Sequence, residues 1–138
     1  MALPIQPDQR HVVQAKHNEE LLHENCFPDP CAQETSKYTD WTVIVAFYVA
    51  LHYIQAYLSK NRFKTDFISH TERNDYLKQY VSVRDRRIDR VLLKYISLYK
   101  LSRKCRYSAC YFHYLKPAFI CNYFVFALQD LPKQLDLT

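Results

Sequence analysis

The sequence predicts an all-α protein, a bundle of about five helices in one domain over residues 1–138, and three observations lead to this fold class. The chain contains no glycine, whereas the tight turns of β-hairpins favour glycine. Several long stretches carry apolar residues at helical spacing. Prolines and polar capping residues separate these stretches. A length of 138 residues suits a single hydrophobic core.

The lack of glycine also excludes classes of function. Phosphate-binding P-loops and dinucleotide-binding fingerprints need glycines for tight turns and for close approach of the backbone to the ligand. We therefore expect neither type of nucleotide site. The composition, with 49% hydrophobic and 24% charged residues, is that of an ordinary folded domain.

The N-terminal part of the chain is predicted to contain one helix between two irregular segments. Residues 1–8 hold two prolines and are expected to form a short arm. A first helix is expected from about Asp8, its N-cap, to Glu24. The segment 25–39 is interrupted by two prolines and is predicted to be a loop.

A second helix, capped by Asp40, is apolar almost all the way round from Trp41 to Leu58. This run has 18 residues, somewhat fewer than the ~20 that a membrane-spanning helix needs, and it contains His52 and Gln55. Polar groups are costly at the centre of a bilayer. The segment is therefore predicted to be the central core helix of a bundle with no membrane association, and His52 to be buried and hydrogen-bonded there.

Three further helices complete the predicted bundle. Ser69 or Thr71 is expected to cap the third helix. The fourth is expected to run from about Arg84 to the region of Arg106. Pro117 is predicted to open the fifth, because proline suits the first turn of a helix.

One stripe of the fourth helix begins aliphatic and ends polar. Because this stripe must face the core, Arg106 has either to pair with a carboxylate, such as Asp40 or Glu72, or to open onto a cleft. In a cleft it would join His52, His70 and Arg73 from the second and third helices. A cluster of Arg and His without carboxylates would indicate a phosphate-binding site. The stripe consists of Ile88, Leu92, Tyr95, Tyr99, Ser102 and Arg106.

The opposite face of the fourth helix is strongly basic. The protein has a net charge of +5, but the segment 84–106 alone holds nine lysines and arginines against two aspartates, a local net charge of +7. Such a face is either a solvated surface or a contact for the phosphates of a nucleic acid. The candidate nucleic-acid-binding residues are Arg86, Arg87, Arg90 and Lys94.

The five cysteines are expected to be free thiols of a cytoplasmic protein. Their number is odd, and the N-terminal residues are too polar for a signal peptide. The chain has no Cys-x-x-Cys pair, and its other Cys and His spacings are poor for zinc. We therefore expect no metal and no cofactor.

Four segments, in this order, resemble the HEPN-like family: "AKHNEEL" (15–21), "DWTVIVAFYVALHYIQAYL" (40–58), "SHTERNDYL" (69–77) and "LYKLSRKCRY" (98–107). The resemblance covers most of the chain and implies an antiparallel helical bundle, often a homodimer. Many HEPN proteins are ribonucleases or toxins of prokaryotic conflict systems, and some pair with a nucleotidyltransferase antitoxin. The resemblance therefore implies a protein that binds or cleaves RNA, with such an antitoxin as a candidate partner.

The ribonuclease signature of this family is an arginine, usually followed by a polar residue, and a histidine after a gap of four to six residues. Arg106 and His113 match it by spacing, although a tyrosine follows Arg106, and they could act on one phosphate only if the helix ends or bends between them. A histidine would transfer the proton and an arginine fork would bind the phosphate, without a metal. The alternative is a non-catalytic module that binds a partner protein or a nucleotide. The candidate catalytic residues are His52, His70, Arg73, Arg106 and His113.

Overall fold

The computed structural model describes residues 7–23, 39–109 and 111–137, which are largely helical and contain no strand. The prediction of an all-α fold is therefore confirmed. The helical elements, which include two stretches of π-helix and one 3₁₀ turn, are α1 Pro7–His23, α2 Thr39–Lys60, α3 His70–Tyr76, η2 Leu77–Val81, α4 Arg86–Tyr107, η3 Tyr111–Tyr114, α5 Pro117–Val125, η4 Phe126–Asp130 and α6 Leu131–Gln134.

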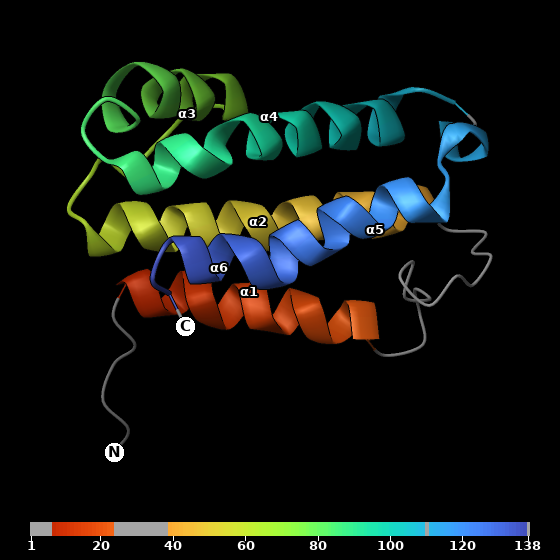
Figure 1. The fold of residues 1–138 in the computed structure, drawn as a ribbon, viewed down its shortest axis with the longest axis horizontal. Helices are drawn as coiled ribbons and strands as arrows, with labels where there is room; N and C mark the ends of the chain where they lie inside the picture. Colours follow the sequence, from red (N-terminus) through yellow and green to blue (C-terminus); the bar gives the residue numbers. More distant parts are fainter. Residues whose placement is uncertain (1–6, 24–38, 110, 138) are drawn as a thin grey trace.

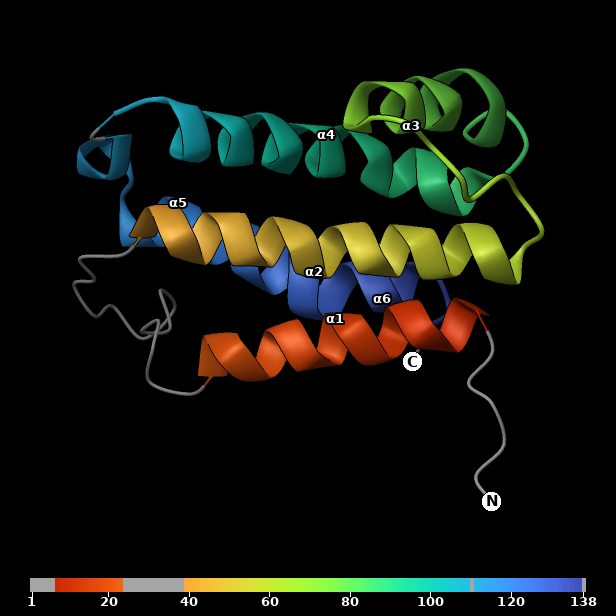
Figure 2. The same ribbon diagram turned by 180° about the vertical axis from the view of Figure 1, so that it is seen from behind.

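Helix α2 is the centre of the bundle. In Figures 1 and 2, α4 lies along one side of α2 and α1 along the other, while α5, η4 and α6 follow α2 as one continuous segment. Successive long segments run in opposite directions, and α3 with η2 lies on the outer side of α4. Within the described residues, five helical segments (α1, α2, α3–η2, α4 and α5–η4–α6) thus form an antiparallel bundle, as the sequence predicts.

The apolar helix α2 is a core helix. By length and composition alone it could span a membrane, but 78% of its apolar stretch is buried inside the fold. Val43 and Phe47 are inaccessible to solvent. The opposite stripe of α2 is more open: Trp41 is 53% exposed, and Tyr48 and His52 are half-buried. This packing is compatible with a soluble protein, and it leaves one polar stripe of α2 within reach of a site.

The predicted N-cap is confirmed for α3 and wrong for α2. Ser69 is the N-cap of α3, because its hydroxyl accepts a hydrogen bond from the backbone N–H of Glu72 at 3.1 Å. Asp40 is not the cap of α2, since the helix already begins at Thr39 and Asp40 lies within its first turn. There its carboxylate still faces the positive end of the helix dipole.

The start of α4 also differs from the prediction. This helix follows the N-cap Asp85 and does not include Arg84, because Asp85 adopts an extended backbone and accepts a hydrogen bond from a first-turn N–H. Pro117 opens α5, as predicted. Nearly all of the predicted arm (1–8) and loop (25–39) lies outside the described residues, and the last two residues of the arm belong to α1.

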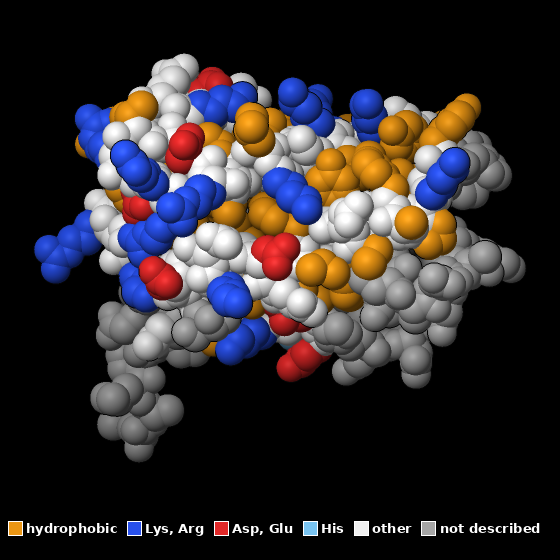
Figure 3. Space-filling model, in the orientation of Figure 1, with side chains coloured by type: hydrophobic (Ala, Val, Ile, Leu, Met, Phe, Trp, Pro, Cys, Tyr) orange, Lys and Arg blue, Asp and Glu red, His pale blue; other side chains and the backbone are white. Residues whose placement is uncertain are grey.

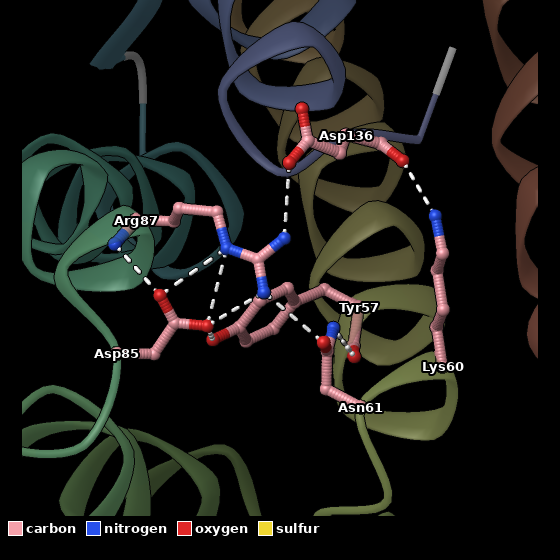
Figure 4. A network of polar contacts seen from close by, with 6 residues as sticks. All are labelled: Tyr57, Lys60, Asn61, Asp85, Arg87 and Asp136. Carbon is pink, nitrogen blue, oxygen red and sulfur yellow. Dashed lines mark hydrogen bonds and ion pairs between the residues drawn. The ribbon is translucent and has the colours of Figure 1, made fainter.

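A polar network, drawn in Figure 4, joins the ends of α2 and α4 to the C-terminal segment. Asp85 accepts a hydrogen bond from the Tyr57 hydroxyl at 2.6 Å and pairs with Arg87 at 2.8 Å. Arg87 also binds Asp136 Oδ2 and Asn61 Oδ1, each at 3.0 Å. Two carboxylates therefore neutralise the Arg87 guanidinium within the fold.

Without glycine, the chain ends two helical segments with other residues at positive φ. Arg62 follows α2 with φ 60°, and the N–H of Phe63 donates to the carbonyl of Leu58 at 2.9 Å, the pattern of a Schellman C-cap. Asp136 adopts φ 55° after α6. This conformation costs a non-glycine residue about 1–2 kcal/mol. The bonds of Asp136 to the network of Figure 4, including one from Lys60 Nζ at 2.8 Å, offset part of that cost.

Candidate functional site

Three of the four residues predicted to contact nucleic acid, Arg86, Arg90 and Lys94, are exposed on α4. In Figure 3, basic side chains are interspersed with carboxylates and hydrophobic side chains. A groove beside Arg90 and Lys94 also contains Asp130, whose carboxylate opposes the binding of an anion. Arg87 is held by the network of Figure 4. The outer face of α4 is thus open but is not shaped around a phosphate.

A second group of basic residues surrounds an open cavity between the start of α3 and the C-terminal half of α4. The cavity has a volume of about 330 Å³, and we call it the arginine cleft. It brings together two predicted catalytic residues, His70 and Arg106, from segments far apart in the sequence. The cleft is lined by Ser69, His70, Thr71, Tyr99, Arg103, Arg106 and Tyr107.

The start of α3 is held in place by side-chain contacts that leave the cleft free of carboxylates. Glu72 pairs with Lys64 at 2.9 Å and accepts a hydrogen bond from a backbone N–H of the preceding loop at 2.7 Å. In the first turn of α3, the His70 ring packs against Phe47 of α2 and Tyr99 of α4, with 5.5 Å between ring centres in each case. His70 is therefore positioned by three helices.

Arg106 reaches α2 and finds no carboxylate there. Its Nη1 donates to the Tyr48 hydroxyl at 3.0 Å, whereas its buried Nε has no hydrogen-bond partner. In the described part of the chain, no ion pair joins Arg106 to Asp40, Glu72 or any other acid. Of the two possibilities open from the sequence, a structural salt bridge or a cleft, the geometry corresponds to the cleft.

Arg73 is 9% exposed and contacts His70 from the inner side of the site. Its Nη1 lies 3.0 Å from His70 Nδ1. A guanidinium can only donate, so Nδ1 accepts and the proton of a neutral His70 is on Nε2. Burial first, and then the charges of the three arginines in this region, lower the pKa of His70. Burial likewise lowers the pKa of Arg73, whose Nε has no partner.

His52 does not line the arginine cleft. Its Nδ1 lies 2.9 Å from the Nδ1 of His11 on α1, and the two rings are stacked with 5.2 Å between their centres. Burial, followed by the charges of His11 and Arg73, lowers the pKa of His52 to about 4. His52 is hydrogen-bonded within the bundle, as predicted, but it is half-buried and not fully buried.

The His11–His52 pair makes stability depend on pH. A pKa of about 4 in the folded state, against about 6.5 in an unfolded chain, means that the unfolded chain binds more protons between these values. The stabilisation is complete above pH 6.5 and is lost as the pH falls towards 4. We expect the midpoint of thermal unfolding to drop over this range more steeply in the wild type than in His52→Gln.

The exposed His17 of α1 provides the matched control. His17→Gln should keep the steep pH dependence of the wild type in the same calorimetric scans. Parallel curves for the wild type and His52→Gln would contradict the assignment of a depressed pKa to this pair.

The three arginines near the cleft lack a matching negative charge. Among the described residues, Arg73, Arg103 and Arg106 form no ion pair with a carboxylate. Within the described ranges, the one hydrogen bond of the Arg103 side chain goes to the hydroxyl of Tyr99, at 3.3 Å. The charge of Glu72 interacts with Arg73. The two carboxylate oxygens of Glu72 accept hydrogen bonds from Lys64 and from the backbone N–H of Ile68. Arg73 is buried, Arg106 is half-buried and Arg103 is exposed, and their positive charges together favour the entry of an anion.

His113 belongs to η3, and its side chain lies outside the described part of the structure. The backbone nevertheless meets the geometric condition for the arginine–histidine signature. Helix α4 ends at Tyr107, and Ser108 is extended, so the helix terminates between Arg106 and His113. The two residues are therefore not separated by two turns of one rigid helix.

The prediction that all cysteines are free thiols is wrong for Cys121, which is disulfide-bonded to a partner outside the described residues. An odd number of cysteines leaves one unpaired but does not prevent others from pairing. Cys105 is free, and burial raises the pKa of its thiol to about 12, which makes it a poor nucleophile at neutral pH. In the described ranges, no three His, Cys, Asp or Glu side chains gather as metal ligands.

Residues of this region that were not among the predicted site residues include His11, Tyr48, Arg103 and Tyr107. Two had a usable signal, because Tyr48 shares a stripe of α2 with His52, and Arg103 lies three residues before Arg106 on one face of α4. His11 had none, since its contact with His52 spans 41 residues.

No protein-family model, curated protein or solved structure matches this chain.

Proposed function

We propose that the protein binds RNA through its phosphates at the arginine cleft. The observation that carries the proposal is that Arg73, Arg103 and Arg106 converge without an ion-paired carboxylate among the described residues. A planar guanidinium binds a phosphate through two parallel hydrogen bonds. The buried Nε atoms of Arg73 and Arg106 have no hydrogen-bond partner among the described residues, so the fold does not fully compensate the charge of these guanidiniums.

Uncharged hydrogen-bond donors at the cleft also suit a phosphate ligand. With Nδ1 occupied by Arg73, His70 carries its proton on Nε2 and can donate it to a phosphate oxygen. The hydroxyl groups of Ser69 and Thr71 belong to residues that line the same cleft. The occupied Nδ1 also means that His70 has no free lone pair for use as a general base, so this geometry favours binding over proton abstraction by His70.

A polyanion suits the protein better than a single small anion. The segment 84–106 has a net charge of +7, and Arg86, Arg90 and Lys94 are exposed on the face of α4 opposite the stripe that ends at Arg106. Each phosphate contact with such residues releases counterions, which strengthens the binding of a nucleic acid at low salt. The outer face of α4 would therefore add a general electrostatic attraction for a polyanion, separate from the contacts made in the cleft.

Metal-independent cleavage of the bound RNA is the second candidate function, and the end of α4 between Arg106 and His113 favours it. The ribose 2′-hydroxyl would lose its proton to a base and attack phosphorus, and the 5′-oxygen would leave with a proton. The products would be a 2′,3′-cyclic phosphate and a 5′-hydroxyl. Cleavage in EDTA that His113→Ala abolishes would support an enzyme, and binding without cleavage would support a non-catalytic module.

The HEPN resemblance adds expectations about context. It suggests a homodimer, active as a toxin and paired with a nucleotidyltransferase-type antitoxin; the cytoplasmic location stays a prediction from the sequence. Leu93 of α4 and Phe119 of α5 are exposed apolar residues, and Figure 3 shows hydrophobic side chains gathered over α4 and α5. Such a surface supports a protein contact.

The RNA-binding proposal is tested by Arg106→Lys and Arg106→Ala. We expect both variants to weaken binding of a short RNA about tenfold or more, because lysine keeps the charge but cannot form the two-pronged contact. Fluorescence anisotropy over a range of salt concentrations measures the affinity, and the salt slope should fall by about one phosphate contact in Arg106→Ala.

Lys104→Gln is the matched control, since Lys104 is an exposed basic residue two positions away on the same helix. It should change affinity far less than Arg106→Lys. If neither the wild type nor any variant binds RNA, or if Arg106→Lys binds as the wild type does, the proposal fails. A loss of thermal stability in both Arg106 variants, with no binding to lose, would identify Arg106 as a structural strut.

A further inference from the structure

We infer that the arginine cleft recognises single-stranded RNA by stacking one unpaired base on Tyr107. The inference rests on the proposed function and adds to it the class of RNA and the residue that selects it. Tyr107 lines the cleft as the last residue of α4. Its side chain is 74% exposed, so the ring is at the rim of the cleft and outside the core.

The Tyr107 ring lies close to both arginines that line the cleft. The Cζ atom of Arg106 is 5.4 Å from the ring centre and that of Arg103 is 5.9 Å away. Both guanidiniums are thus close enough to interact with the aromatic ring. A nucleotide whose phosphate binds these guanidiniums would have its base within reach of the ring.

The same two arginines also donate hydrogen bonds to tyrosine hydroxyls of α2 and α4. Arg106 contacts Tyr48, with its Nη1 at 3.0 Å from the hydroxyl, and Arg103 contacts Tyr99 at 3.3 Å in the same manner. These contacts anchor the guanidiniums to α2 and α4 while Tyr107 stays accessible. A rigid phosphate site beside an accessible ring is the arrangement by which proteins bind single-stranded nucleic acids.

An unpaired base is required because the faces of paired bases are covered by their neighbours in the stack. The deep groove of double-stranded RNA also excludes side chains from the base edges. The cleft volume of about 330 Å³ is at the lower end of the sizes of small-ligand pockets, ~300–1,000 Å³. It suits one nucleotide and not a double helix.

Adenosine 5′-monophosphate and ribose 5-phosphate separate the base from the phosphate in the test. Calorimetric titration of the wild type should show tighter binding of adenosine 5′-monophosphate, and Tyr107→Ala should bind the two compounds equally. A short single-stranded RNA should bind the wild type more tightly than a duplex of the same length, and Tyr107→Ala should weaken the single strand about tenfold. Tyr107→Trp should retain or strengthen it.

Tyr114→Ala is the matched control. Tyr114 is 77% exposed, as open as Tyr107, but it does not line the cleft. This variant should bind every ligand as the wild type does, and Tyr107→Ala should keep the wild-type thermal midpoint because its side chain is outside the core.

The outcomes distinguish the inference from the proposed function. Equal binding of the two small phosphates by the wild type, equal binding of duplex and single strand, or an unchanged Tyr107→Ala would overturn the stacking inference and leave the phosphate site intact. Absence of all binding by the wild type would remove both. If Tyr107→Ala changes the oligomeric state on size-exclusion chromatography with light scattering and leaves RNA binding unaffected, Tyr107 is a protein contact and the inference is overturned.

Discussion

Replacing Asp85 by alanine is expected to lower the free energy of unfolding by about 2–4 kcal/mol. Asp85 caps α4 by accepting a hydrogen bond from the backbone N–H of Arg87 at 2.9 Å, and loss of an acidic cap costs roughly 0.5–2 kcal/mol. Its other oxygen accepts from the Tyr57 hydroxyl at 2.6 Å. Tyr57 is fully buried, so an unpaired hydroxyl there costs a further ~1–3 kcal/mol.

Thermal and urea unfolding measure this effect, with a shift in midpoint on the order of 10 °C. The control is Asp89→Ala, an exposed acid in the first turn of the same helix. Asp85→Asn should be intermediate, because an amide oxygen can still cap the helix while the ion pair with Arg87 is lost. Equal unfolding midpoints for Asp85→Ala and Asp89→Ala would contradict the role assigned to this network.

Low pH should weaken the contact between Asp85 and Arg87. The hydrogen bonds from Arg87 lower the pKa of Asp85 to about 2, whereas an ordinary aspartate titrates near 3.8. The folded protein therefore binds fewer protons at this site than the unfolded chain. Its contribution to stability is complete above about pH 4 and is lost as the pH falls towards 2.

The helices were predictable because their signals are local. Apolar spacing identified α2 and the buried stripe of α4, and Ser69 was recognisable as a cap. The network of Figure 4 was not predictable. Helical spacing places Arg87 on the outer face of α4, but the side chain turns to Asp136, which is 49 residues away and lies at the C-terminus. No local pattern encodes such a contact.

The candidate site was predictable in the same limited way. The i, i+3 spacing of His70 and Arg73 places them on one face of α3, and they are in contact at 3.0 Å. The stripe of α4 placed Arg106 towards α2, where it meets Tyr48. The position of His52 beside His11, outside the cleft, depends on how α1 packs against α2. That packing is set by the whole core and not by any short segment.

Substitution of Arg73 should affect RNA binding and thermal stability in opposite directions. Arg73 is 9% exposed, and among the described residues it has no ion pair and no partner for its Nε, so its contacts with His70 and the Phe67 ring compensate only part of the cost of burying its charge. Replacing buried charged groups by apolar residues of similar volume is often stabilising, by about 1–4 kcal/mol. We therefore expect Arg73→Met to raise the midpoint of thermal unfolding by a few degrees in the absence of ligand.

The same substitution should weaken RNA binding about tenfold or more. It removes a positive charge from the site and releases His70 Nδ1, so that the proton of His70 is no longer confined to Nε2. Arg73→Lys keeps a charge but not the fork, and should be less stable than Arg73→Met while still binding RNA poorly. Anisotropy and calorimetry on the three proteins measure both properties.

Arg73→Met is expected to raise the unfolding midpoint and to weaken RNA binding, and these opposite effects distinguish a ligand-binding arginine from a structural one. A structural arginine would lose stability on replacement by methionine, because the groups that it holds would lose their partner. If the charge of Arg73 is retained only for a ligand, the protein gains stability when methionine removes that charge. Adding RNA should reverse the order, and raise the unfolding midpoint of the wild type more than that of Arg73→Met. If Arg73→Met is less stable than the wild type and RNA stabilises both equally, Arg73 belongs to the scaffold and the phosphate site must exclude it.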